Sequence, residues 1–182
     1  MRKTVILALV CVTIGVGLYA QADSDILPEL YDVKVDNCGL NAALFLLYWF
    51  DLPVGISQLQ SELRVGPHWE LPTSMLLLKK EFEVKGLTVN AYKDATLDEV
   101  LASVDDKHVC LLHVNIENSK EGHFYLVTAV QSRGVLLVDA MKSHDWIQVD
   151  DFKNQFAKSF SGYYLSVSRS PSPRAHNDQE GH

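Results

Sequence analysis

Residues 37–50 read NCGLNAALFLLYWF, a predominantly apolar run that contains neither proline nor a charged side chain. Apolar side chains recur along it at helical spacing, at Leu40, Ala43, Leu44, Leu47 and Tyr48. This pattern predicts a helix over Cys38–Phe50, with Asp36 or Asn37 able to cap its first turn. Because the helix is apolar nearly all round, we expect it to be buried.

The remainder of the chain changes from helical to β-rich patterns. Helices are predicted over residues 56–63, 73–83, 96–104 and 149–156. Strands are predicted over residues 87–92, 108–116, 123–130, 135–138 and 163–168. Helices that precede antiparallel strands at short spacing predict an α+β domain, in which N-terminal helices pack on an antiparallel β-sheet.

Two local expectations refine this outline. In the helix over residues 73–83, the inward-facing side chains are expected to be Met75, Leu76, Leu78 and Phe82. Residues 144–146, His-Asp-Trp, are polar or bulky and fall outside the predicted strands, so they are expected to form a surface loop.

Composition limits the class of protein. The 182 residues are 47% hydrophobic and 21% charged, which is sufficient for one globular domain with a core and does not fit disorder, collagen or a coiled coil. The formal net charge is −7. An acidic chain needs a local basic patch to bind nucleic acid, and the sequence contains none.

The N-terminus has the layout of a secretory signal peptide. Arg2 and Lys3 precede an apolar run over residues 4–17, and Ala20-Gln21-Ala22 offers small residues for cleavage. An uncleaved membrane anchor is the alternative, although it needs a longer run of about 20 apolar residues. We therefore expect a signal peptide over residues 1–22, a domain over 23–168, a disordered tail over 169–182, and a secreted or periplasmic protein without a stable membrane span.

Cys38 lies where a loop enters the predicted buried helix. A helix N-terminus carries partial positive charge and unpaired backbone N–H groups, which stabilise a thiolate and can receive an oxyanion. Gly39, the next residue, would let a substrate backbone come close. Cys38 is therefore a candidate nucleophile.

A cysteine nucleophile needs a base, and His123 opens one predicted strand while Asp139 ends the next. A regular hairpin about the turn at residues 131–134 would place residue 126 opposite Asp139 and residue 123 opposite residue 142. Asp139 would then lie within a few residues of His123 along the sheet edge. A carboxylate there could hold the tautomer and orientation of the imidazole.

Each of these residues also has a purely structural interpretation. A cysteine at the start of a helix is frequently a small buried residue, and Cys38 could form a disulfide with Cys110 in an exported protein. Cys110 lies in an apolar strand and is expected to be a buried core thiol. His108 and His113 are five residues apart on one strand and therefore on opposite faces, which argues against a shared metal site.

The ordered set of residues resembles the bacteriocin-processing, double-glycine leader cysteine peptidase family. The matching segments are Asn37-Cys38-Gly39, His123-Phe124 and Val138-Asp139, within a resemblance over roughly residues 27–167. The resemblance implies a papain-like cysteine peptidase fold. It also implies that Cys38 is the nucleophile, His123 the general base and acid, and Asp139 the residue that orients the histidine.

Three positions differ from the family pattern. Asn37 stands where the family has Asp, Ala140 where it has Pro, and Asp32 where it has a Gln whose amide donates to the oxyanion. An ionised Asp accepts instead, and loss of one such donor costs about 10²–10³ in rate. Asn37 or the backbone N–H of Cys38 would then have to substitute.

Two functions of different classes remain open. One is an exported thiol hydrolase that cleaves a peptide bond through a Cys38–His123–Asp139 triad and a thioester acyl-enzyme. The other is a catalytically inactive peptide-binding domain on the same fold, which Asp32 favours. Acyl transfer to an amine, as in transglutaminase-like enzymes, is a further alternative. The expected partner is a peptide or protein substrate, and no cofactor, metal or nucleic acid is expected.

Overall fold

Helix α2, Cys38–Trp49, forms where the apolar run predicts it. Asn37 is its N-cap, and its side-chain oxygen accepts a hydrogen bond from the backbone N–H of Leu40 at 2.8 Å. Most of the helix is buried, at Gly39, Leu40, Ala42, Ala43, Phe45, Leu46 and Leu47. The predicted buried helix is thereby confirmed.

The computed structural model describes residues 37–52, 54–65, 73–117, 122–139 and 143–170, all within one compact unit. The predicted signal peptide, Asp32, Asp36, His68 and Ala140 lie outside the described residues, as does the tail beyond residue 170. None of the helices in the described part of the chain has the length and apolar character needed to cross a bilayer.

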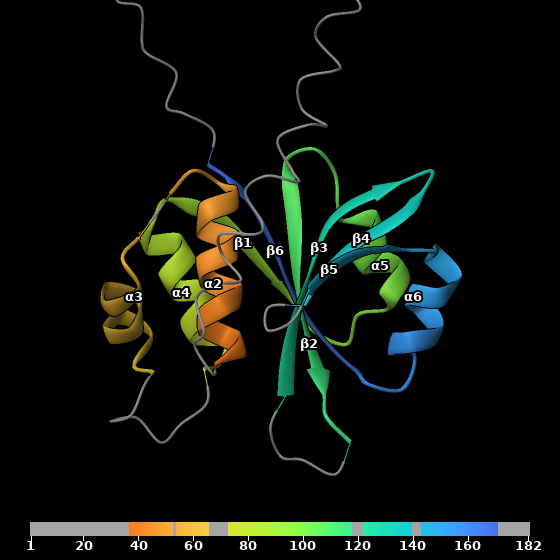
Figure 1. Ribbon diagram of the computed structural model, residues 1–182, viewed down its shortest axis with the longest axis horizontal. Coiled ribbons are helices and arrows are strands. Elements are labelled where there is room, and N and C mark those ends of the chain that lie inside the picture. Colours follow the sequence, from red (N-terminus) through yellow and green to blue (C-terminus); the bar gives the residue numbers. More distant parts are fainter. Residues whose placement is uncertain (1–36, 53, 66–72, 118–121, 140–142, 171–182) are drawn as a thin grey trace, which may run out of the picture. The chain divides into compact units, whose positions relative to one another are not determined.

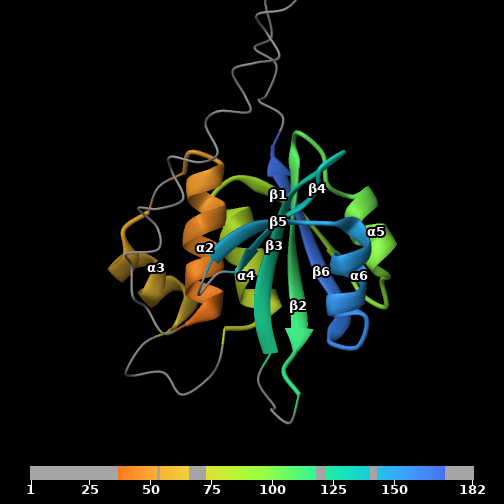
Figure 2. The same cartoon turned by 45° about the vertical axis from the view of Figure 1, so that its right-hand side comes forward.

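Six strands form one sheet in the order β1-β6-β2-β3-β4-β5, and every neighbouring pair is antiparallel. The strands are β1 Leu87–Tyr92, β2 His108–Asn115, β3 Gly122–Gln131, β4 Gly134–Asp139, β5 Ser143–Ile147 and β6 Phe160–Arg169. The other helices are α3 Ile56–Leu63, α4 Met75–Val84, α5 Leu97–Ala102 and α6 Val149–Phe156. Figures 1 and 2 show α2, α3 and α4 on one side of the sheet and α5 and α6 on the other. The predicted α+β architecture is confirmed.

A β-bulge in β3 changes the register that a regular hairpin would have. Near the turn Val130 lies opposite Val135, but beyond the bulge Tyr125 lies opposite Asp139, one residue away from the predicted pairing. Thr128, the additional residue of β3, is buried, and its hydroxyl lies 3.5 Å from the carbonyl oxygen of Leu136, which accepts its hydrogen bond. Since a shift of one residue moves a side chain to the opposite face, the bulge decides which face of β3 Asp139 shares.

The expectation that residues 144–146 form a surface loop is wrong, because they belong to the edge strand β5. Its Trp146 pairs with Leu136 of β4, and the guanidinium of Arg133 in the β3–β4 turn lies 3.6 Å from the centre of the Trp146 ring. A short polar segment has little intrinsic β signal, so its strand form depends on pairing with β4 and on this cation–π contact.

The inward face of α4 also differs from expectation. Leu78 and Phe82 are fully buried, but Leu76 is 75% exposed. Residues two positions apart on a helix are separated by about 200° of rotation, so Leu76 and Leu78 cannot both face the core. The prediction that Leu76 faces the core is therefore wrong.

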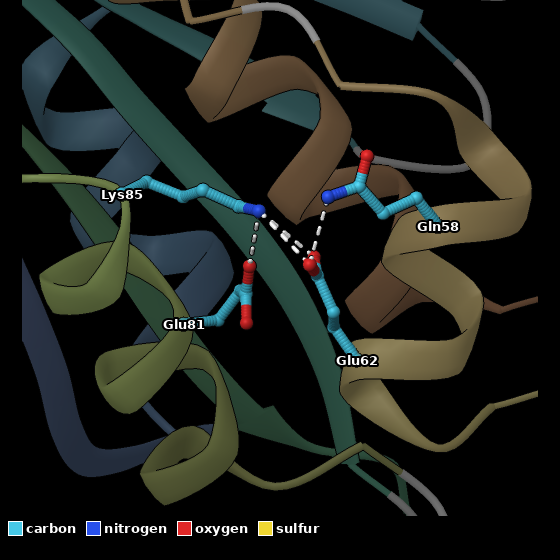
Figure 3. Close-up of polar contacts among 4 residues, drawn as sticks. All are labelled: Gln58, Glu62, Glu81 and Lys85. Atoms are coloured by element: carbon cyan, nitrogen blue, oxygen red, sulfur yellow. Dashed lines mark hydrogen bonds and ion pairs between the residues drawn. The ribbon is translucent and has the colours of Figure 1, made fainter.

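An ionic cluster joins α3 to the end of α4 (Figure 3). The Lys85 ammonium lies 2.9 Å from Oε2 of Glu62 and 3.2 Å from Oε1 of Glu81, while the Gln58 amide donates to Glu62 at 2.9 Å. Burial raises the pKa of Glu81, and the nearby Glu62 acts in the same direction. Lys85 offsets part of the cost of burying Glu81 beside a second carboxylate.

The end of the described chain continues into the segment that was expected to be a tail. Arg169 is the last residue of β6, and its guanidinium donates to the carbonyl oxygen of Phe50 at 2.7 Å and to the carboxylate of Asp51 at 2.6 Å. The folded domain therefore includes at least this residue, which connects β6 to the end of α2.

Leu76 and Leu78 of α4 provide a matched test of the orientation of this helix. We expect Leu78→Ala to lower the free energy of unfolding by about 2–5 kcal/mol, because it leaves a cavity in the core. Leu76→Ala should change it by less than about 0.5 kcal/mol. Urea unfolding of both variants measures the difference, and equal losses would show that α4 is rotated from the orientation described.

Candidate active site

The first turn of α2 presents Cys38 at a half-buried position. The Asn37 side-chain oxygen accepts from the Leu40 N–H and also from the hydroxyl of Thr73, at 3.1 Å. Thr73 precedes α4, so this hydrogen bond connects the start of α4 to the start of α2. The oxygen of Asn37 therefore acts as a cap and as an anchor beside the candidate nucleophile.

The sequence suggested that Gly39 lets a substrate backbone come close, but the structure leaves no open approach there. A Cβ at residue 39 would lie 2.4 Å from the Cβ of Thr73, closer than real side chains allow. The space above Gly39 is therefore occupied by Thr73. Glycine is required here because two chain segments pack closely, which sequence spacing could not reveal.

His123 and Asp139 form a direct pair. Nε2 of His123 lies 2.9 Å from Oδ1 of Asp139, and the two side chains are only 16% and 14% exposed. With the bulge, Asp139 lies opposite Tyr125, so it shares the face of β3 that carries Tyr125 and His123. In the regular register it would have faced the opposite side.

Cys38 is the second group that acts on the same imidazole, since its presence raises the pKa of His123. Since Nε2 is engaged by Asp139, Nδ1 is the ring nitrogen that remains for the thiol. Burial alone would lower the pKa of His123, but the hydrogen bonds and charges of Asp139 and Cys38 outweigh it and raise the pKa to about 9. The structure thus brings together the three residues that the sequence nominated from separate elements.

The second thiol of the described chain is a core residue, as predicted. Cys110 is fully buried, its thiol points to the carbonyl oxygen of Val100 at 3.8 Å, and burial raises its pKa to about 12. Both Cys38 and Cys110 are free thiols. Cys110 is therefore a poor nucleophile, whereas Cys38 has an imidazole partner.

Tyr125 is a neighbour of the site that the sequence reasoning missed. Its ring meets that of His123 edge to face, with 4.8 Å between the centres, and in the β3–β4 ladder it lies opposite Asp139. The alternation along residues 123–127 does place His123 and Tyr125 on one face, which is a signal for their proximity. The pairing with Asp139 depends on the bulge and could not be read from that alternation.

The ring of His113 packs over Gly122, the residue that precedes His123. Its Nδ1 lies 3.0 Å from Oγ of Ser161, whose hydroxyl donates to the carbonyl oxygen of His113 at 2.8 Å. The hydroxyl proton is used in that bond, so Nδ1–H of His113 donates to Ser161. A Cβ at residue 122 would lie 1.9 Å from Nε2 of His113. Gly122 is thus required for space at the start of β3.

The other histidines on β2 do not join the site. His108 pairs with Asp105 at 2.8 Å, at the end of β2 opposite to the end that pairs with Gly122. His113 lies on the other face, as predicted from the spacing. Within the described ranges, no group of three or more His, Cys, Asp or Glu side chains is arranged to hold a metal ion.

Helices packed on a six-stranded antiparallel sheet, with a thiol at the start of the buried helix, define an α+β domain with the papain-like fold. The sequence matches the peptidase C39 family over residues 28–172, and the chain belongs to this family of cysteine peptidases. The resemblance to the double-glycine leader peptidases is therefore confirmed. No curated protein matches the chain.

Solved structures support the same fold at low sequence identity. The double glycine motif protease of an AMS/PCAT transporter, in complex with the leader peptide, is 17% identical, with a TM-score of 0.58 over 76% of this chain and 88% of that one. The peptidase domain of Streptococcus ComA, a bi-functional ABC transporter in quorum sensing, is 14% identical, with a TM-score of 0.59 over 75% and 96%. The C39-like domain of a Vibrio parahaemolyticus toxin secretion ATP-binding protein is 14% identical, with a TM-score of 0.52 over 75% and 99%.

The packing at Gly122 leads to a test. Gly122→Ala should lower the free energy of unfolding by about 1–3 kcal/mol, because the new methyl group collides with the ring of His113. His113→Ala in the same chain should remove most of this additional cost, as a double-mutant cycle would show. Gly55→Ala is the control, since a Cβ there meets no atom within 4 Å. A cost at Gly122 no larger than at Gly55 would contradict the packing.

The pH dependence of stability follows from His123. Its pKa in the folded state, about 9, lies above the ordinary histidine value of 6.5. The pair therefore stabilises the fold fully below pH 6.5, and this stabilisation is lost as the pH rises through 9. The free energy of unfolding that is lost between these pH values amounts to about 3 kcal/mol. Urea unfolding between pH 6 and 9.5 should show this loss in the wild type and not in His123→Gln, with His108→Gln behaving like the wild type.

Proposed function

We propose that this chain is an exported thiol hydrolase that cleaves a peptide bond, with Cys38 as nucleophile, His123 as general base and acid, and Asp139 as the residue that orients the imidazole. The observation that carries the proposal is that His123 interacts with both Cys38 and Asp139. Its Nε2 is paired with the Asp139 carboxylate, and Cys38 raises the pKa of the same imidazole. Membership of the peptidase C39 family supports the same reaction class.

The proposed reaction begins from a thiolate of Cys38 beside the imidazolium of His123, a pair in which the thiol proton resides on Nδ1. The thiolate attacks the carbonyl carbon of the scissile peptide bond, and the carbonyl π electrons move to oxygen. We assign the backbone N–H of Cys38 as a donor to this oxyanion, because the first N–H groups of a helix have no acceptor within the helix. Asp139 stabilises the imidazolium during this step.

The tetrahedral intermediate then collapses to a thioester. The C–N bond breaks, and Nδ1 of His123 returns its proton to the leaving amine. In the second half, His123 takes a proton from water, the hydroxide attacks the thioester carbonyl, and the C–S bond breaks. The peptide acid and the thiol of Cys38 are released, so that one water is consumed for each peptide bond cleaved.

The substrate class that we propose is a peptide or a protein segment. A protein with the same fold was solved in complex with the leader peptide, which supports a peptide ligand for this domain type. Asp32 favours the second candidate, a catalytically inactive peptide-binding domain, because it stands where the family has an oxyanion-donating Gln. Export of this chain rests on the signal-like segment at residues 1–22.

Alkylation of the mature protein by iodoacetamide tests whether His123 activates the thiol. At pH 6 we expect Cys38 to react at least about ten-fold faster in the wild type than in His123→Ala, because the imidazole accepts the thiol proton. His108→Ala is the matched control and should react like the wild type. Peptide mapping assigns the modified thiol to Cys38 rather than to Cys110. A Cys38 rate that ignores the loss of His123 would refute activation by this residue.

A second readout separates the enzyme from the binding domain. Mass spectrometry of a peptide library should show cleavage that Cys38→Ala abolishes and that Asp139→Asn reduces by about 10²-fold or more. Asp32→Gln should raise the rate by about 10²–10³ if the family donor is what this chain lacks. Peptide binding without cleavage in both the wild type and Asp32→Gln would favour the binding domain. An added amine that captures the acyl group would indicate transfer instead of hydrolysis.

A further inference from the structure

A cavity of about 300 Å³ opens between the end of β1, helix α5 and strand β6. It lies apart from the candidate active site. Tyr164 in its wall and Asp139 in that site belong to one row across the sheet, with β2 and β3 between their strands. Three strand spacings of about 4.8 Å each separate the two residues by about 14 Å. Binding in this cavity therefore does not depend on the proposed peptidase function.

Two stacked tyrosines form an aromatic wall of the cavity. The rings of Tyr92 and Tyr164, a cross-strand pair on β1 and β6, have their centres 4.5 Å apart and lie within 8° of parallel. Tyr164 is 2% exposed, whereas Tyr92 is 43% exposed. Tyr164 thus anchors the stack in the core, and Tyr92 presents an accessible ring. Such a ring attracts a planar or cationic group through the negative charge on its face.

The hydroxyl groups of the wall have already used their protons. Oγ of Ser103 donates to the carbonyl oxygen of Glu99 at 2.8 Å. The Tyr164 hydroxyl lies 2.9 Å from the same Oγ and must therefore be the donor in that bond. Both hydroxyl oxygens keep lone pairs, so a ligand that hydrogen-bonds to them has to supply the donor.

Acidic side chains outnumber basic ones in the lining. Among the described residues that line the cavity, Asp94 and Glu99 are acidic and Lys93 is the one basic residue. Oε2 of Glu99 accepts from the backbone N–H and the hydroxyl of Thr96, at 2.7 and 2.9 Å, and these bonds lower the pKa of Glu99. Its Oε1 takes no part in them. The lining therefore favours a cation that carries several donors.

The loop after β1, which forms another wall, is fastened to β6. Asp94 has a φ of 55°, in the left-handed region, and the backbone N–H of Ala95 donates to the carbonyl oxygen of Gly162 at 3.1 Å. Gly162 has a φ of 79°, and a Cβ there would lie 3.4 Å from the Cα of Asp94. The wall is therefore preformed, which limits the conformational entropy lost when a ligand binds.

We propose that this cavity binds the guanidinium group of an arginine side chain on a peptide or protein partner, with the guanidinium against the Tyr92 ring and its N–H groups directed to the Glu99 carboxylate and the hydroxyl oxygens of the wall. A guanidinium is planar, permanently charged and carries five N–H donors and no acceptor, which matches an aromatic and anionic wall of acceptors. A cavity at the small end of ligand sites accommodates one such side chain rather than a large ligand. The ammonium of lysine is a compact, strongly hydrated charge and fits a flat ring with fixed acceptors less well.

NMR titration of the mature protein with N-acetyl-arginine amide tests this proposal. We expect saturable shifts of the backbone amides of Ala95 and Ser103. N-acetyl-citrulline amide, which has nearly the same shape and no charge, should bind at least about five-fold more weakly. Tyr92→Leu removes the aromatic ring and should weaken binding of the arginine amide by about two- to five-fold. Glu99→Gln keeps the capping box with Thr96 but loses the charge, and should weaken binding by a similar factor.

Tyr163→Leu is the matched control. Tyr163 is 49% exposed and adjacent to Tyr164, but successive residues of a strand face opposite sides of the sheet, so this variant should bind like the wild type. Equal binding of the arginine and citrulline amides, no saturable shift at Ala95 and Ser103, or binding that both Tyr92→Leu and Glu99→Gln leave unchanged would overturn the proposal. None of these measurements depends on cleavage, so a failure here would not bear on the peptidase function.

Discussion

The β-bulge of β3 is the constraint on which the site depends. A regular ladder from the β3–β4 turn would place Asp139 opposite Leu126, on the face of the sheet away from His123. Thr128 occupies the additional position, and beyond it Asp139 lies opposite Tyr125 instead. One additional residue in one strand therefore aligns the carboxylate with the imidazole, while Phe124, Leu126 and Val127 of the same strand are buried. The bulge is part of the site, although none of its atoms takes part in the proposed reaction.

The strength of the interaction between His123 and Asp139 follows from their burial. His123 and Asp139 are both largely shielded from water, which strengthens their hydrogen bond and penalises either charge alone. Burial disfavours the imidazolium, but the interactions of His123 with Asp139 and Cys38 outweigh this cost and raise its pKa. The same principle appears outside the site, where Lys85 lies between Glu62 and the buried Glu81 (Figure 3). In both places a buried ionisable group is tolerated because a group of opposite charge lies beside it.

The site is supported from two sides by contacts that carry no chemistry. Thr73 closes over Gly39 and bonds to Asn37, which holds the first turn of α2 against the segment before α4. On the other side, α6 supports the Tyr125 ring through Phe156. The fold that results is shared with solved peptidase domains at 17% identity or less. At such sequence distances the arrangement of helix, strand and turn persists although most residues differ.

The sequence by itself determined what depends on local pattern. Apolar periodicity placed the buried helix at Cys38, the order of helices and strands indicated the fold class, and the ends of two strands nominated His123 and Asp139. Only the tertiary structure decided the register of β3, the β-strand form of residues 143–147, the outward direction of Leu76 and the pairing of Tyr125 with Asp139. These features depend on which residues become neighbours after the chain folds, through strand pairing, helix rotation and close packing. Contacts between residues that are distant in the sequence cannot be predicted from its periodicity.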